Sequence, residues 1–444
     1  MDNSLAVKKK PRKLWLIILI VVALLAVVVS LPPVWSRVSY HAIGVYRTVK
    51  YWIKPPSEAV FVPSTPQPAN QPTVLPTGIS SETKITPVAS VPTPTIVPVS
   101  LPPSVMLTGI SCERQFMNNC GPATLSMTLS FYDWGKDQMA VASVLKPNEK
   151  DVNVMPYELV DFVNNHTELR ALWRVGGDLQ TIKTLLNAGF PVMIEKSFEP
   201  FDLRDEGWMG HYNLVVGYDD ARQALTVHDS YLMIKTPWGI EIPREMWDTF
   251  EGFDFYYSDL EQAWRSFNFV FIVVYPPEKE DEVLKVLGPL ANEQEAYKIA
   301  YDRALLETSS LQGVRDKFFA WFNAGTSLVG MKDYTAASAA YDTAFGIYPE
   351  IEEKSRPYRI LWYATGPYEA YYNTGRYQDV INLATQTLSY MAEPVIEESY
   401  YWRALSYYAL GDTTRAVADL RTSLNYHPGY TPSLTMLEKL GKQP

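Results

Sequence analysis

Residues 115 to 127 read QFMNNCGPATLSM, and the fold assignment starts from the cysteine within them. Cys120 is one of two cysteines in the chain, and a Gly-Pro pair and an apolar run follow it. Proline is tolerated in the first turn of a helix, where its missing N–H would be unpaired in any case. We therefore predict a helix that begins at about Cys120. A thiol at the positive end of this helix would have a lowered pKa and could act as a nucleophile, whereas the alternative is a buried thiol at a tight helix start.

A nucleophilic thiol needs a basic partner, and two of the five histidines are candidates. His211 opens the alternating run HYNLVVGY, and His228 lies near the end of the next strand-like run. The YDDARQ segment between them has turn chemistry, so we predict a β-hairpin centred near residues 220–221. This hairpin would place His211 opposite or nearly opposite Asp229, where a carboxylate can hold an imidazole nitrogen. Alternation puts His228 on the other face, where we expect an ordinary surface or hairpin residue.

These side chains would form a catalytic triad assembled from separate parts of the chain. Cys120 would be the nucleophile, His211 the base and Asp229 the group that orients the base. Gln115 lies five residues before the cysteine, and its side-chain amide could join the Cys120 backbone N–H in binding an oxyanion. The alternative is that Gln115 is an ordinary exposed polar residue ahead of a helix.

Four segments together resemble the C39-like peptidases, which are papain-fold cysteine peptidases: QFMNNCGPA, LLNAGFPVMI, GHYNLVVGYDD and VHDSY. The resemblance covers about residues 106–277, and it implies an α+β papain-like domain with helical patterns first and strand patterns afterwards. It implies Cys120 as nucleophile, His211 as general base and acid, and Asp229 as the orienting group. Gln115 would lie in the oxyanion hole. The best-known members are fused to ABC exporters and cut leader peptides after a double glycine. This chain has a single apolar span and no P-loop signature, so we do not expect leader processing.

Helical patterns dominate after Pro277, and an internal repeat lies among them. Residues 321–349 carry Trp, Gly, Tyr, Ala and Pro at the spacings of a tetratricopeptide repeat, which this stretch resembles. Two further stretches repeat this spacing of residues, with Gly375 and Gly411 at equivalent turns. We therefore predict an all-α repeat domain of three helix pairs over residues 280–444. Such repeats bind protein or peptide on a concave face, so we expect a protein partner, although a structural spacer or a dimerisation unit is the alternative.

The N-terminal part of the chain predicts a membrane anchor and a long tether. Residues 1–13 are basic, and residues 14–33 form an apolar segment long enough to span a bilayer as a transmembrane helix. The positive-inside rule keeps the N-terminus in the cytoplasm and the remaining chain outside. Residues 34–54 are typical of a juxtamembrane segment, and residues 55–105, rich in Pro, Thr and Ser, of a linker without a packed core. A cleaved signal peptide is the alternative to the anchor.

The composition of the chain argues against nucleic-acid binding and against cysteine-based metal sites. The net charge of −10 argues against nucleic acid as a partner. Two cysteines cannot build a disulfide framework or a four-cysteine zinc site, and no HExxH motif occurs, so we expect no metal and no cofactor. Cys112 lies eight residues before Cys120, and a bridge between the two would silence the enzyme or switch it.

The predicted function is hydrolysis of peptide bonds in a peptide or protein substrate by a membrane-anchored, extracytoplasmic cysteine peptidase. Two alternatives stay open. One is a catalytically silent papain-like scaffold that binds proteins through its repeats, and the other is an acyltransferase or amidase with the same triad.

Overall fold

The computed structural model describes residues 45–46, 49–53, 60–63, 101–148, 150–199, 207–232 and 251–444. The chain divides into two compact units, residues 1–56 and residues 57–444. The described residues of the first unit are helical. The predicted membrane segment at residues 14–33 lies outside the described residues, and so does most of the predicted linker. No helix within the described ranges is long and apolar enough to cross a bilayer.

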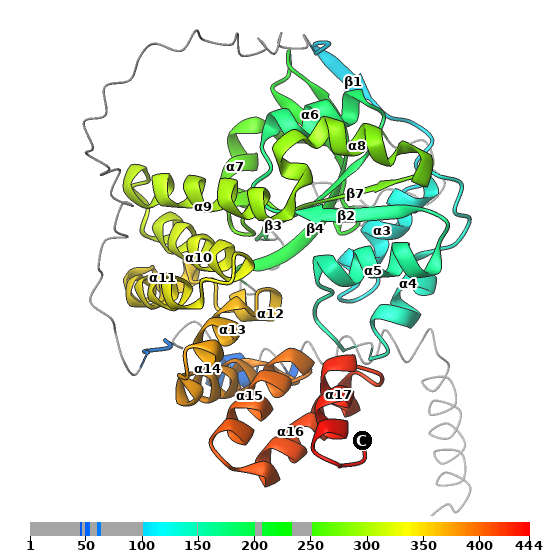
Figure 1. The fold of residues 1–444 in the computed structure, drawn as a ribbon. Helices are drawn as coiled ribbons and strands as arrows, with labels where there is room; N and C mark the ends of the chain where they lie inside the picture. Colours follow the sequence, from blue (N-terminus) through cyan, green and yellow to red (C-terminus); the bar gives the residue numbers. More distant parts are fainter. Residues whose placement is uncertain are drawn as a thin grey trace, which may run out of the picture. The chain divides into compact units, whose positions relative to one another are not determined.

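An antiparallel sheet of seven strands organises the first part of the second unit (Figure 1). Its strands are β1 (Ser104–Met106), β2 (Arg170–Arg174), β3 (Val192–Phe198), β4 (Met209–Asp219), β5 (Ala224–His228), β6 (Phe253–Tyr256) and β7 (Phe271–Tyr275). The order is β2-β7-β3-β4-β5-β6, and β1 pairs with β4. Strands β3, β4, β5 and β7 lie in the segments whose β-branched and aromatic residues predict strands. The same pattern did not indicate β1, β2 or β6.

Helices cover both faces of the sheet (Figure 1). One face is covered by α3 (Cys120–Ser130), α4 (Gln138–Leu145) and α5 (Pro156–His166), and the other by α6 (Leu179–Asn187), α7 (Tyr257–Arg265) and α8 (Glu280–Leu287). Because successive strand residues point to opposite faces, Leu214 packs with Leu125 of α3, while Val215 packs with Ile182 of α6. Helix α8 follows the predicted end of the sheet domain, yet its Val283 is buried in the same core as Ile182.

Local sequence signals set the boundaries of α3 and α6. Helix α3 begins at Cys120, as the following Gly-Pro pair predicts. Asp178 caps helix α6, because its carboxylate accepts a hydrogen bond of 2.6 Å from the backbone N–H of Thr181. Gly189 follows the end of α6 with a φ of 87°, in the left-handed region that favours glycine.

The rest of the second unit is helical. Its helices are α9 (Glu293–Ser310), α10 (Val314–Gly330), α11 (Tyr334–Ile347), α12 (Ile360–Tyr363), α13 (Gly366–Asn373), α14 (Tyr377–Tyr390), α15 (Glu397–Ala409), α16 (Thr413–Tyr426) and α17 (Thr431–Lys439). Short 3-10 helices occur at η5 (Pro277–Lys279), η6 (Gly288–Ala291), η7 (Tyr348–Glu350) and η8 (Glu353–Ser355). Pairs α10/α11, α13/α14 and α15/α16 correspond to the three predicted helix pairs. A Cβ at Gly325 would lie 2.8 Å from the ring of Tyr341, so a glycine there lets α10 approach α11 closely.

The sheet domain and the repeats share a hydrophobic core within the second unit. Trp208, directly ahead of β4, stacks on Phe267 with ring centroids 5.6 Å apart, and Phe319 of α10 lies 5.7 Å from the same indole. Arg359 Nη1 donates a hydrogen bond of 2.9 Å to the Trp208 carbonyl oxygen. Since β4 also carries His211, the repeat helices support the strand that holds the predicted base.

Candidate active site

The loop that leads into Cys120 is held by two polar side chains. Gln138, which is only 1% exposed, accepts a hydrogen bond of 3.0 Å from Asn119 Nδ2. Lys146 Nζ donates to the carbonyl oxygen of Asn118 at 2.6 Å. Both partners come from the segment after α3, and no motif in the sequence pointed to them. They fix the backbone immediately before the thiol.

Three neighbouring groups make the Cys120 thiol acidic. Burial alone would raise the pKa of this thiol. A hydrogen bond to His211 and the charge of its imidazole oppose that effect, and the pKa of Cys120 lies below its ordinary value as a result. The backbone of Tyr212 and the charge of Lys146 lower the same pKa further. The thiol is therefore placed to exist as a thiolate beside an imidazolium.

His211 is bonded to Asp229 inside the protein. The distance from His211 Nε2 to Asp229 Oδ1 is 2.8 Å, and both residues are buried. Burial opposes the charge of His211, but the Asp229 carboxylate and Cys120 outweigh it and raise the pKa of His211 to about 9. Because Nε2 is taken by the carboxylate, Nδ1 is the nitrogen left for the thiol.

Asp229 is held by the backbone that follows it. Its Oδ1 also accepts hydrogen bonds from the backbone N–H groups of Tyr231 at 2.9 Å and Leu232 at 3.0 Å. Burial would raise the pKa of Asp229, but the charges of His211 and Lys196 keep that pKa well below its usual range. Asp229 therefore stays ionised and can orient the imidazole.

The predicted hairpin forms, but its register is shifted from the expected one. Leu214 pairs with His228, and a bulge lies between Val215 and Gly217. Extending this register by one residue sets Asn213 across from Asp229, so the carboxylate reaches His211 diagonally. The predicted contact between His211 and Asp229 is confirmed, and the two residues are nearly opposite rather than directly paired, because the hairpin is centred about one residue later than expected. The extra β4 residue at the bulge brings Asp229 onto the same face of the sheet as His211.

Gln115 is oriented by a residue that the sequence did not single out. Ser230 Oγ donates a hydrogen bond of 2.9 Å to Gln115 Oε1, and the Gln115 backbone N–H donates to the Ser230 carbonyl oxygen at 3.1 Å. Ser230 is fully buried and directly follows Asp229. With Oε1 engaged, the side-chain nitrogen of Gln115 is the end available to a ligand.

Two further side chains on β3 border the site. Phe198 stacks on the imidazole of His211 with ring centroids 4.9 Å apart. Glu195 is 3% exposed, and its Oε1 has no hydrogen-bond partner among the described residues. Burial raises the pKa of Glu195 well above its ordinary range, and the negative charge of Cys120 adds to the rise. Glu195 is therefore a neutral acid beside the thiol; the sequence indicated only that this segment is a strand.

His228 lies in the predicted hairpin, but the expectation of a surface residue was wrong. This residue is 4% exposed, and its Nδ1 lies 3.3 Å from the sulfur of Cys112, which is itself buried. Burial lowers the pKa of His228 to about 4, so its imidazole is neutral. The error arose because strand alternation shows which face a residue occupies but not that α3 to α5 cover that face. Neither Cys112 nor Cys120 forms a disulfide.

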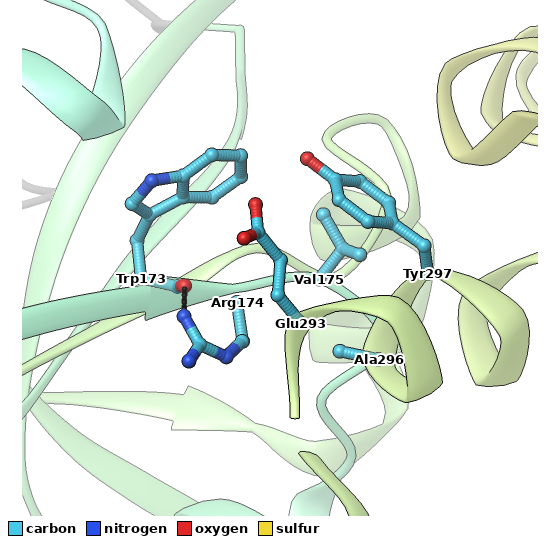
Figure 2. A pocket seen from close by; sticks show the side chains of 6 residues that line it. All are labelled: Trp173, Arg174, Val175, Glu293, Ala296 and Tyr297. Carbon is cyan, nitrogen blue, oxygen red and sulfur yellow. Dashed lines mark hydrogen bonds between the residues drawn. The ribbon is translucent and has the colours of Figure 1, made fainter. Parts of the chain in front are cut away.

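A small hollow lies away from these residues, between β2 and α9 (Figure 2). Its lining residues are Trp173, Arg174, Val175, Glu293, Ala296 and Tyr297. Arg174 Nη1 donates to the Trp173 carbonyl oxygen at 2.7 Å, so this guanidinium already has a partner (Figure 2). None of the six belongs to the predicted triad.

Comparisons with known proteins agree with both resemblances seen in the sequence. The model of the "Peptidase_C39 like family" matches residues 107–262, and two tetratricopeptide-repeat models match residues 320–351 and 398–430. A crystal structure described as that of a C39-like peptidase from Bacillus anthracis is 18% identical. The match covers 38% of this chain and 96% of that one, with a TM-score of 0.27. No curated protein matches the chain. The chain thus contains a C39-like peptidase domain with an antiparallel sheet, followed by a helical region of tetratricopeptide repeats.

Proposed function

We propose that this protein is a membrane-anchored, extracytoplasmic cysteine peptidase that hydrolyses peptide bonds, with repeats that recruit its substrate or a partner protein. One observation carries the proposal. The Cys120 thiol has a lowered pKa, the partner His211 has a raised one, and Asp229 holds that histidine at 2.8 Å. A structural thiol in an apolar core would have the opposite shift, because burial alone raises its pKa.

The proposed reaction starts from the thiolate–imidazolium pair. The sulfur of Cys120 attacks the carbonyl carbon of the scissile peptide bond, and the carbonyl oxygen becomes an oxyanion. The Gln115 side-chain nitrogen and the Cys120 backbone N–H donate hydrogen bonds to this oxyanion. Nδ1 of His211 then gives its proton to the departing amine, which leaves an acyl-enzyme.

Hydrolysis of the acyl-enzyme reuses the same base. Neutral His211 takes a proton from a water molecule, and the resulting hydroxide attacks the thioester carbonyl carbon. The bond to sulfur breaks, the acid product leaves, and the thiolate–imidazolium pair is restored. Asp229 keeps the imidazole in one orientation through both steps.

Membrane anchoring is the second part of the proposal. It is supported by the basic residues 8–13 that precede the apolar segment at residues 14–33, since positively charged flanks are retained in the cytoplasm. Protease added to intact cells should digest a tag at the C-terminus and spare a tag at the N-terminus. Digestion of both tags, or recovery of the full-length chain in the soluble fraction, would contradict the anchor.

The experiment for the activity uses the full-length chain and a mixture of peptides, with products identified by mass spectrometry. Cleavage that is lost in Cys120→Ala and retained in Cys112→Ala is the expected result. Adding a primary amine as acceptor separates the alternatives, because dominant amide products would indicate acyl transfer rather than hydrolysis. Peptide binding without turnover would favour the scaffold, and cleavage that survives Cys120→Ala would contradict the proposed nucleophile.

A further inference from the structure

An aromatic side chain from the predicted linker is buried in the repeats. Residues 60–63 read Val-Phe-Val-Pro and precede the sheet domain in the chain, and Phe61 is only 7% exposed. The centroid of its ring lies 5.1 Å from that of Phe345 in α11 and 6.1 Å from that of Tyr371 in α13. We propose that these two helices form a binding site for an extended peptide with the pattern aromatic–x–proline, and that residues 61–63 of the same chain occupy this site.

The burial pattern of the segment is that of an extended peptide. Phe61 and Pro63 are buried, whereas Val62 between them is 69% exposed. Alternation of buried and exposed residues is typical of extended backbone, in which neighbouring side chains point to opposite sides. Pro63 favours the same conformation, because the residue before a proline is restricted to the extended region. The segment therefore presents an aromatic ring and a proline ring to one side.

The two walls of the site are held by contacts within the repeats. The hydroxyl of Tyr371 donates a hydrogen bond of 2.9 Å to Asp342 Oδ1. The ring of Phe345 packs at right angles to that of Phe322 in α10, with centroids 6.3 Å apart. Because these contacts do not involve Phe61, both walls should keep their positions without it. A site formed in advance also loses little freedom when a ligand binds.

The contacts of Phe61 indicate which ligand the site selects. Its ring meets the ring of Phe345 at 77°, and aromatic pairs prefer such an edge-to-face arrangement. Phe345 and Tyr371 belong to successive repeats, so a single repeat could not form the site. The inference rests on the recruiting role of the repeats in the proposed function. It gives the recruited protein a chemical feature, namely an aromatic–x–proline segment in an extended conformation.

The segment in the same chain has an advantage over a free peptide. A ligand linked to its own site acts at an effective concentration on the order of millimolar, whereas a free peptide acts only at the concentration supplied. A free peptide with the same sequence should therefore bind poorly while Phe61 is in place. It should bind readily once the Phe61 ring is removed, because the walls of the site remain.

The test is fluorescence anisotropy with a labelled peptide of residues 57–66 and the full-length Cys120→Ala chain as parent, in which the proposed nucleophile cannot cut the peptide. We expect saturable binding to the chain that also carries Phe61→Ala, and binding at least about tenfold weaker to the parent. Val62→Ala alters the exposed neighbour and should bind the peptide no better than the parent.

A changed peptide tests the role of the aromatic ring. The peptide that carries Phe61→Ala should bind at least about tenfold more weakly than the unchanged peptide, because it lacks the buried anchor. The proposal would be overturned by equal binding of the two peptides. It would equally be overturned if the unchanged peptide showed no saturable binding to the Phe61→Ala chain, or bound that chain and the parent equally well.

Photo-crosslinking locates the bound peptide. A benzophenone side chain in place of the Phe61 ring in the peptide should crosslink to α11 or α13, as mapped by mass spectrometry, and crosslinks confined to other helices would contradict the site. Thermal melting checks that the Phe61→Ala chain is folded. If it melts well below the parent, Phe61→Leu, which keeps much of the packing, takes its place and should also bind the peptide more tightly than the parent.

The binding measurements do not depend on peptidase activity. Absence of peptide binding to the repeats would leave the proposed reaction at Cys120 intact. Conversely, a chain without cleavage activity could still bind the peptide between α11 and α13. The two proposals can therefore fail separately.

Discussion

The hydroxyl of Ser230 donates a hydrogen bond of 2.9 Å to the side-chain oxygen of Gln115, one residue after the carboxylate that holds His211. Two adjacent residues at the end of β5 therefore orient both the proposed base and the proposed oxyanion donor. The backbone N–H of Gln115 reaches the carbonyl oxygen of Ser230 as well, so the segment before Cys120 is paired to the segment after β5. The site therefore forms where the loop before α3 and the loop after β5 are hydrogen-bonded to each other.

Removing the oxyanion donor should slow the chemical step. We expect Gln115→Ala to lower kcat by about 10²- to 10³-fold, because one preorganised donor to the oxyanion is lost. Ser230→Ala should lower kcat less, since it frees the amide to rotate without removing it. Ser258→Ala, at an exposed serine on α7, is the matched control. Steady-state kinetics with a peptide substrate checks all three, and a Gln115→Ala enzyme with wild-type kcat would contradict the assignment.

The pH profile of the enzyme should reflect the ion pair. A lowered thiol pKa and a His211 pKa of about 9 predict a kcat/KM plateau through neutral pH that falls above about pH 9, when the imidazolium loses its proton. In Asp229→Asn the carboxylate charge that raises the His211 pKa is gone, so the upper limb should move to lower pH. The rate should also fall, because the orienting acceptor is changed. An upper limb that stays in place in Asp229→Asn would show that another group titrates there.

Glu195 should behave as a neutral acid beside the thiol. Its raised pKa means that Glu195→Gln, which keeps the shape and removes the acidic proton, changes little at neutral pH. We expect the alkylation rate of Cys120 to stay within about twofold of wild type, because the charge near the thiolate is unchanged. A Glu195→Gln thiol that reacts many times faster at neutral pH would mean that Glu195 is ionised in the free enzyme. The measurement is the pseudo-first-order rate with iodoacetamide across pH.

The local parts of the site could be predicted from the sequence, and the parts made by distant segments could not. The start of α3 at Cys120 follows from Gly-Pro, and the hairpin follows from alternation and turn residues. Gln138 and Ser230 act only after folding brings them to the Cys120 loop from elsewhere in the chain. Periodicity also cannot reveal the β-bulge, although this bulge is what places His211 and Asp229 on one face of the sheet.

The shared core should make the repeats necessary for a stable peptidase domain. Trp208 is 1% exposed between Phe267 and Phe319, so Trp208→Ala should lower the free energy of unfolding by about 3–5 kcal/mol. Trp52 is 82% exposed, and Trp52→Ala should change that free energy by no more than about 0.5 kcal/mol. Urea denaturation followed by circular dichroism measures both values. A Trp208→Ala protein as stable as Trp52→Ala would show that the two domains do not depend on each other.

Thiol labelling should distinguish the two cysteines. Cys112 is 6% exposed and lies against the neutral imidazole of His228, whereas Cys120 is partly exposed and has a lowered pKa beside the imidazolium of His211. A thiolate reacts and a buried thiol does not, so a small alkylating probe at neutral pH should label the native full-length chain at Cys120. Peptide mapping should find that label lost in Cys120→Ala and retained in Cys112→Ala. The opposite pattern would mean that the more reactive sulfur is the one bonded to His228, and the proposed nucleophile would then be wrong.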